Sequence, residues 1–122
     1  LVSNLDIAPT VLTAAGLDVS PALQGHNLLS YIEEEKAPGP DYLFLEHDTG
    51  SESDGRPLPR VEGVRTADWK YARYKDTDPA IEELFDLTAD PVEEVNLVSS
   101  PAHAERLAEM RALFTKAKAE AR

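Results

Sequence analysis

The stretch ELFDLTADPVEEVNL, residues 83–97, contains the clearest structural pattern in this chain. Residues 83–87 are mostly apolar, which predicts a short strand that fills the core. Asp90 and Pro91 form a pair that is typical of a turn, and the side chain of Asn96 is suited to fixing the next turn. We therefore expect this stretch to supply architecture and no chemistry.

Three more strands are predicted upstream of this stretch. Residues 41–47 are rich in strand formers, and residues 60–66 and 69–74 flank a two-residue turn and so form a hairpin. Gly63 inside the hairpin indicates a bulge or a close approach of the backbone. The strands are joined mostly by short links, which favours antiparallel pairing. Residues 48–59 are predicted to be a polar loop long enough to have a function.

Downstream, a final helix is predicted to begin at Pro101. Its apolar residues recur at intervals of three and four, as on one face of a helix: Leu107, Met110, Phe114, Ala117 and Ala121. A helix packed on one face of the sheet gives an α+β fold with a four-stranded antiparallel sheet.

The N-terminal third has a different pattern. A helix is predicted over residues 6–15, with Ile7, Val11, Leu12 and Ala15 on its apolar face, and a second short helix over residues 28–32. The segment Ala37-Pro38-Gly39-Pro40 breaks regular structure and is the best internal boundary.

Composition limits the function classes. The chain has 122 residues, no cysteine and a net charge of −11, which argues against nucleic acid as a partner. No apolar run approaches the ~20 residues needed to cross a bilayer. The chain begins at Leu1 in patterned sequence, so we expect it to be a piece of a longer parent protein. Residues 60–75 carry five basic and two acidic residues, and would attract an anion unless they are solvated strand-edge charges.

Neither a metal site nor a nucleophile is predicted. Residues 76–94 are strongly acidic, but they lack the central glycine of an EF-hand loop, so a solvated acidic face is expected. No serine has the G-x-S-x-G or S-x-x-K setting of a catalytic nucleophile. His26 and His103 are expected to face solvent.

Three residues are candidates for substrate binding: His47, Arg60 and Arg65. Each lies at or near a predicted strand end, where cationic side chains could bind a sulfate or a sugar oxyanion. The alternative is an ion pair between Glu46 and Arg65 on neighbouring strands. A further candidate, an aromatic stripe, could stack sugars or simply pack in the core: Trp69, Tyr71 and Tyr74.

Four ordered motifs resemble those of sulfatases. Residues 6–12 (DIAPTVL) resemble the segment D-I-x-P-T-[IVL]-L, and residues 24–29 (QGHNLL) resemble x-G-x-S-L-L, with Asn27 where serine is usual. Residues 64–71 (VRTADWKY) resemble the hairpin V-R-x-x-x-[WY]-K-[YL]. Residues 83–97 resemble E-L-[YF]-D-L-x-x-D-P-x-E-x-x-N-L, the longest of the four.

This resemblance implies that an α/β catalytic domain precedes the chain in its parent. That domain would hold a formylglycine, made within a C-x-[PA]-x-R motif that no segment here matches, and a calcium ion, and it would hydrolyse sulfate esters. Residues 1–40 would form the edge of that domain, and residues 41–122 a C-terminal subdomain beside its active-site cleft. His47 and the loop after it would then help to select the substrate.

The resemblance also implies the partners. The chain would contact the catalytic domain of its parent and, through the parent, a sulfated small molecule or carbohydrate. An apolar patch over residues 1–35 is expected where that domain is missing, and it could join two chains in a homodimer. A periplasmic or secreted parent is compatible with the resemblance, and the compartment stays open.

Two alternatives remain. The chain could be the tail of a related phosphonate or phosphate ester hydrolase, because tail motifs can be shared within the superfamily. It could also be an independent carbohydrate-binding or interaction module.

Overall fold

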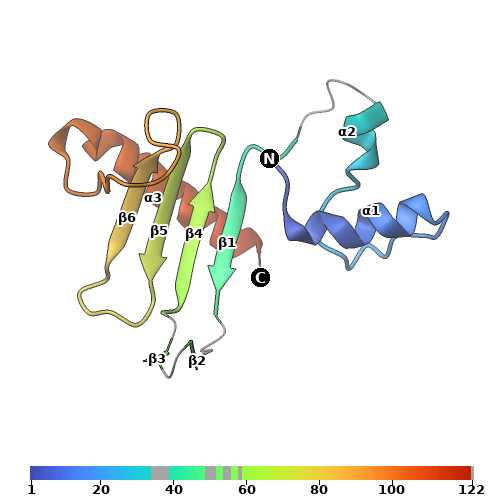
Figure 1. Ribbon diagram of the computed structural model, residues 1–122, viewed down its shortest axis with the longest axis horizontal. Coiled ribbons are helices and arrows are strands. Elements are labelled where there is room, and N and C mark those ends of the chain that lie inside the picture. The colour runs from blue at the N-terminus through green and yellow to red at the C-terminus, as the bar shows by residue number, and fades with distance from the viewer. Residues whose placement is uncertain (34–38, 49–51, 54–55, 58, 122) are drawn as a thin grey trace. The chain divides into compact units, whose positions relative to one another are not determined.

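A computed structural model describes residues 1–33, 39–48, 52–53, 56–57 and 59–121. The chain divides into two compact units, Leu1–Asp41 and Tyr42–Arg122. Figure 1 shows both units.

The second unit is a four-stranded antiparallel sheet with one long helix across a single face (Figure 1). The sheet order is β1-β4-β5-β6, with β1 (Leu43–His47), β4 (Val61–Arg65), β5 (Trp69–Tyr74) and β6 (Glu82–Asp86). A 3-10 turn, η2 (Pro101–His103), leads into the helix α3 (Ala104–Glu120). The predicted α+β fold is confirmed.

The core lies between the sheet and α3. Val64, Tyr71 and Leu84 are almost fully buried on one sheet face, because they are direct partners across β4, β5 and β6 and the side chains of directly opposed residues lie on the same face. The predicted helix stripe meets them and is buried at Leu107, Met110, Phe114 and Ala117, whereas Ala121 lies just beyond the end of α3. Among the aromatic residues of β5, Trp69 and Tyr71 pack with this core, so the predicted packing role holds for these two.

The predicted turn residues after β6 bind backbone groups. Asn96 Oδ1 accepts hydrogen bonds from the Leu84 and Val98 amides, both at 3.0 Å, and Asn96 Nδ2 donates to the Glu82 carbonyl at 3.1 Å. Asp90 Oδ2 accepts from the Val95 amide at 2.8 Å. These residues are architectural, as the sequence predicts.

Two features of the sheet refine the sequence-based picture. The predicted loop 48–59 contains a two-stranded pair, β2 (Glu52–Ser53) and β3 (Arg56–Pro57), which was not expected. Gly63 marks a close backbone approach, as predicted, because a Cβ at this position would lie 2.6 Å from the Tyr71 carbonyl oxygen.

The first unit contains η1 (Asn4–Asp6), α1 (Ile7–Ala14) and α2 (Leu29–Glu33), close to the two predicted helices. The acidic residues after Glu33 and residues 37–38 of the predicted boundary at residues 37–40 lie outside the described residues. Ser3 and Asp6 form a capping box at the start of η1, which satisfies amide groups that the helix itself leaves free.

Asp6 also connects the beginning of η1 to a distant loop. Its buried carboxylate accepts hydrogen bonds from the amides of Ser3 at 2.6 Å and His26 at 2.7 Å. Burial opposes ionisation of this carboxyl, but the two amides outweigh it and lower the pKa of Asp6.

Thr10 Oγ1 accepts from the Leu28 amide at 2.9 Å. Gly25 has a φ of +100°, and a Cβ there would lie 2.4 Å from the Leu5 carbonyl oxygen.

The predicted apolar face of the first helix is largely exposed. Ile7 and Val11 are each 60% exposed. Other large apolar side chains of this unit are exposed as well: Val2, Leu5, Leu17, Val19, Leu23 and Ile32. Exposed apolar groups at this density are typical of a surface that another protein surface covers.

Candidate functional site

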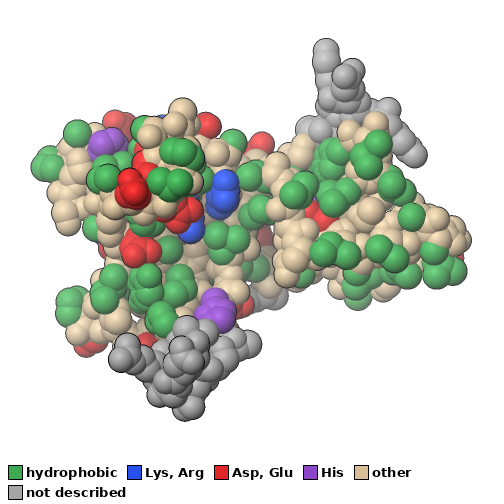
Figure 2. All heavy atoms as spheres, in the orientation of Figure 1, with side chains coloured by type: hydrophobic (Ala, Val, Ile, Leu, Met, Phe, Trp, Pro, Cys, Tyr) green, Lys and Arg blue, Asp and Glu red, His purple; other side chains and the backbone are tan. Residues whose placement is uncertain are grey.

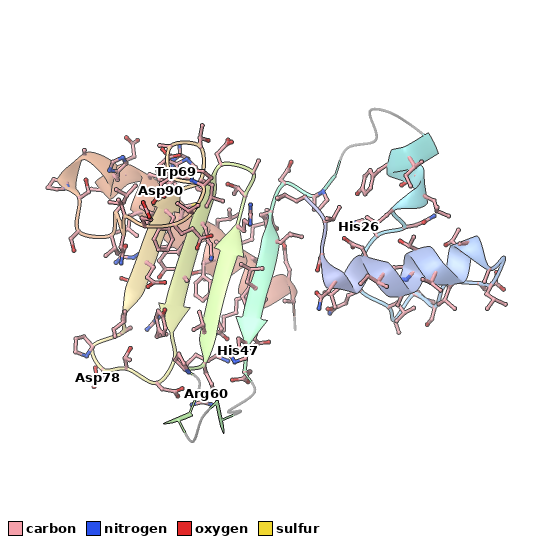
Figure 3. The ribbon with its side chains drawn as sticks, viewed as in Figure 1. His26, His47, Arg60, Trp69, Asp78 and Asp90 are labelled. Carbon is pink, nitrogen blue, oxygen red and sulfur yellow. The ribbon has the colours of Figure 1, made fainter. Side chains whose placement is uncertain are left out.

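The three predicted substrate-binding residues lie at two different ends of the sheet. His47 ends β1 and is paired with Val61, and Arg60 immediately precedes Val61, so His47 and Arg60 share one end (Figure 3). Arg65 ends β4 at the opposite side, where its partner is Leu43. At ~3.3 Å per residue, Arg65 lies about 16 Å along the strand from Arg60. The fold therefore brings together only His47 and Arg60.

Arg60 is held by neighbouring carboxylates. Its Nε donates to Asp76 Oδ1 at 3.0 Å and to Asp76 Oδ2 at 3.1 Å, and its Nη1 lies 3.9 Å from Asp48 Oδ1. The hydrogen bond to Asp76 raises the pKa of Arg60, and the same contact lowers the pKa of the Asp76 carboxyl. Most of the charge of Arg60 is thus balanced within the chain.

Lys75, directly after β5, is the centre of an ion-pair network. Its Nζ lies 3.1 Å from Glu46 Oε1, from Asp48 Oδ1 and from Glu62 Oε1. The expected pair between Glu46 and Arg65 is wrong, because the strand register places Glu46 opposite Glu62. Two carboxylates on neighbouring strands repel each other, and Lys75 compensates both.

Glu62 anchors this network in the interior. The residue is 3% exposed and binds Lys118 of α3 as well as Lys75. Burial opposes ionisation of this carboxyl, but the hydrogen bonds from Lys118 and Lys75 outweigh it and lower the pKa of Glu62. The hydrogen bond to Glu46 in turn raises the pKa of Lys75. The network joins β1, β4, β5 and α3 at one end of the sheet.

His47 points away from this network. Glu62 and Val64 face α3, so the alternation of β1 places Glu46 on the helix side and His47 on the open face, in one cross-strand row with Val61 and Tyr74. His47 is exposed, and Figure 2 shows a histidine on the surface where Figure 3 labels His47. A neutral imidazole can donate one hydrogen bond and accept another, so His47 is free to contact a ligand on this face.

Comparison with known proteins decides the family. The model of the family "N-sulphoglucosamine sulphohydrolase, C-terminal" matches residues 1–120. The chain belongs to this family. It is 31% identical over 105 residues to arylsulfatase K of Mus musculus, covering 81% of this chain and 18% of that protein. It is 30% identical over 111 residues to an arylsulfatase of Clostridium perfringens, covering 91% of this chain and 21% of that protein.

A solved structure agrees with the sequence match. The structure of BT4656 in complex with its substrate D-glucosamine-2-N,6-O-disulfate superimposes with a TM-score of 0.76 and 28% identity, covering 91% of this chain and 22% of that one. This sulfatase C-terminal chain therefore spans about a fifth of the length of the relatives that it matches. The matches favour the sulfatase interpretation over the two alternatives.

The acidic stretch of this sulfatase C-terminal chain is mostly engaged. Asp76 binds Arg60, Glu93 lies 2.5 Å from Lys70 Nζ, and Asp90 accepts backbone amides. These carboxylates are exposed or half-buried, as a solvated acidic face predicts, and they also compensate cations and amides. In the described part of the chain, no group of histidine, aspartate and glutamate side chains is arranged to hold a metal ion, and no helix has the length and apolarity to span a membrane.

His26 and His103, the other two histidines, differ in their exposure to solvent. His26 is exposed, as predicted, with its ring Nδ1 3.6 Å from Asp6 Oδ1. His103 is half-buried and was wrongly expected to face solvent. Its ring lies 5.9 Å from that of Trp69, and its Nδ1 lies 3.0 Å from Ser100 Oγ.

Sequence patterns do not single out the residues that hold this end of the sheet. Lys75, Asp76 and Glu62 stand out in the sequence only as parts of charged stretches. The available signal was the pair Lys75-Asp76 directly after a predicted strand, but its partners follow only from the strand register.

Proposed function

We propose that this chain is the C-terminal region of a sulfatase that hydrolyses sulfate esters. The observation that carries the proposal is the family match over residues 1–120, together with the small share of each relative that the chain spans. The nucleophile and its metal, expected to be formylglycine and calcium, would belong to the catalytic domain that precedes this region.

The two units have separate roles in this proposal. Residues 1–40 form the edge of the catalytic domain, which would cover the exposed apolar side chains of η1 and α1. Residues 41–122 form a subdomain beside the active-site cleft. Without the catalytic domain, the same apolar side chains would favour a homodimer.

The proposed substrate is a sulfated small molecule or carbohydrate, and His47 is its contact in this region. Support comes from the exposed position of His47 on the open face. Arg60 lies at the same end of the sheet and would contribute mainly to the local electrostatic field, because Asp76 already binds its guanidinium. Arg65, at the far end of β4, would reach only a second part of a long ligand.

The test is kinetic and uses the full-length gene product. We expect turnover of sulfate esters and a kcat/KM for H47A that is lower by on the order of tenfold, mainly through KM, since a binding contact is removed. R65A, at the other end of the same sheet, is the matched control and should stay close to wild type on a small sulfate ester.

Three outcomes would contradict parts of this proposal. Preferential turnover of phosphonate or phosphate esters would replace the sulfatase assignment. Wild-type kinetics for H47A would remove His47 from the substrate site. Turnover of a chromogenic sulfate ester by this chain alone, above a blank purification, would place catalytic groups in the C-terminal region itself.

A further inference from the structure

Residues 48–60 connect β1 to β4, and the residues that follow β5 hold both ends of this connection. At one end, Lys75 Nζ lies 3.1 Å from Glu46 and 3.1 Å from Asp48. At the other end, the Lys75 amide donates to the Arg60 carbonyl at 2.9 Å, and Asp76 binds the Arg60 guanidinium. The dipeptide Lys75-Asp76 therefore bridges the two strand ends.

Lys75 binds the two residues that flank His47 in the chain. Glu46 and Asp48 are its immediate neighbours in the chain, and one ammonium group binds both of their carboxylates. His47 itself points to the opposite face of β1. The backbone that carries the imidazole is thus fixed from the helix side, while the ring stays accessible on the open side.

The ammonium group of Lys75 also has a buried partner. Its third partner, Glu62, is 3% exposed and also binds Lys118 of α3. Without the charge of Lys75, the carboxylates of Glu46, Asp48 and Glu62 would lose the cation that they share, and Lys118 at Glu62 and Arg60 at Asp48 would offset them only in part. Like charges at such short range repel strongly where water is partly excluded.

We infer that Lys75 is a positioning residue that sets the orientation of His47 toward the substrate. This inference rests on the proposed function, because it takes His47 as a substrate contact. Lys75 would act on substrate selection without touching substrate. Small displacements of a contacting group can change rates by up to ~100-fold.

The activity test compares K75M with K118M in the full-length protein. Both variants remove one ammonium group from Glu62, but only Lys75 binds the neighbours of His47. We expect K75M to raise KM on the order of tenfold with little change in kcat, K118M to leave KM within about twofold, and K75R to recover most of the loss, since arginine keeps the charge.

A double-variant cycle separates positioning from general destabilisation. If Lys75 acts through His47, adding K75M to H47A changes kcat/KM by less than about twofold, because the contact is already absent. A full, multiplicative loss in the double variant, or equal KM effects of K75M and K118M, would overturn the inference.

An NMR measurement on this chain tests the positioning independently of catalysis. We expect K75M to shift the amide resonances of residues 46–48 and the ring resonances of His47, and K118M to leave them in place. Unchanged His47 resonances in K75M would overturn the inference even if the protein is a sulfatase. Wild-type kinetics for H47A would instead remove the role of His47 in the proposed function, and with it the functional consequence of Lys75. In that case, shifted resonances in K75M would still show that Lys75 holds the strand end.

Discussion

The side chain of Asn96 binds three backbone groups. It accepts two amide hydrogen bonds, from Leu84 and Val98, and donates one to the Glu82 carbonyl. One planar amide thereby holds the segment after β6 against the strand itself. Because these bonds join its side chain to the backbone of the chain itself, Asn96 contributes to stability.

Replacing Asn96 by alanine should therefore destabilise the sheet unit. N96A leaves two amides without their acceptor, which costs about 2–3 kcal/mol of unfolding free energy. Urea unfolding followed by the fluorescence of Trp69, the single tryptophan, measures the change. N96D, which keeps the acceptor oxygen, should lose less, and a loss in N96A below about 0.5 kcal/mol would contradict this role.

Glu62 gives a second prediction, on pH dependence. Its pKa is lower in the folded chain than in the unfolded one, so its stabilisation is complete above the unfolded value of about 4.3 and is lost as pH falls through the folded value. We expect the unfolding free energy of wild type to fall on acidification below this range. E62Q should be less stable by about 2 kcal/mol at neutral pH. Its unfolding free energy should also fall less steeply on acidification, that is, it should show a shallower acid limb.

The matched control for Glu62 is E109Q on the exposed side of α3. Glu109 is 53% exposed and pairs with Arg106 three residues earlier, and such surface pairs contribute little. Chemical unfolding between pH 3 and 7 measures how steeply the unfolding free energy of wild type, E62Q and E109Q depends on pH. An acid limb of E62Q as steep as that of wild type would show that Glu62 is not a source of the acid sensitivity.

At the scale of elements, the hairpin β4–β5 depends on the absence of a side chain at Gly63. A Cβ at this position would lie 2.6 Å from the Tyr71 carbonyl oxygen on the paired strand, so G63A must push the strands apart. We expect a loss of about 2 kcal/mol or more in unfolding free energy.

R65A is the control for this substitution, because Arg65 is exposed on the same strand and should change stability by less than about 0.5 kcal/mol. Hydrogen exchange of the β4 and β5 amides would localise the effect. Wild-type protection in G63A would mean that the strands accommodate a methyl group without separating.

The elements themselves were predicted better than their register. The bounds of β5 follow from its strand formers and the flanking turn signals, and α3 follows from the spacing of its apolar stripe. The register of β1 on β4 is set by contacts between residues that lie far apart in the sequence, so the partners of Glu46 and Arg65 could not be read locally. The short pair β2 and β3 has two residues in each strand, too few for any periodicity.

At the scale of the whole molecule, the buried apolar cluster of the described residues lies in the second unit. Its buried cluster joins three strands with α3: Val64, Tyr71, Leu84, Leu107, Met110, Phe114 and Ala117. All of these residues lie within 42–122, and a core of this kind is what allows a unit to fold alone.

We therefore expect residues 42–122 to fold without the first unit. Their urea midpoint, followed by Trp69 fluorescence, should lie close to that of the 122-residue chain, whereas dye binding to exposed apolar surface should fall because η1 and α1 are removed. An excised segment that unfolds at much lower urea would show that the first unit supports the sheet.

The candidate site was predictable only in part, because some of its contacts join residues that lie far apart in the sequence. His47 could be singled out because it ends a predicted strand. Lys75 could not, because its carboxylate partners Glu46 and Asp48 lie 29 and 27 residues away in the sequence. Their meeting requires the pairing of β1, β4 and β5 together.

The ionic bridge from Lys75-Asp76 to both strand ends has a consequence for protein engineering. Because Lys75 and Asp76 bind both ends of the connection, we expect the pairing of β1 with β4 to tolerate a change in its length. Each doubling of a flexible loop costs only ~0.6 kcal/mol in closure entropy. Under the proposed function, we expect an exchange of the interior of this connection between sulfatases to alter selectivity, provided that the four residues bound at its base are kept: Glu46, Asp48, Arg60 and Glu62.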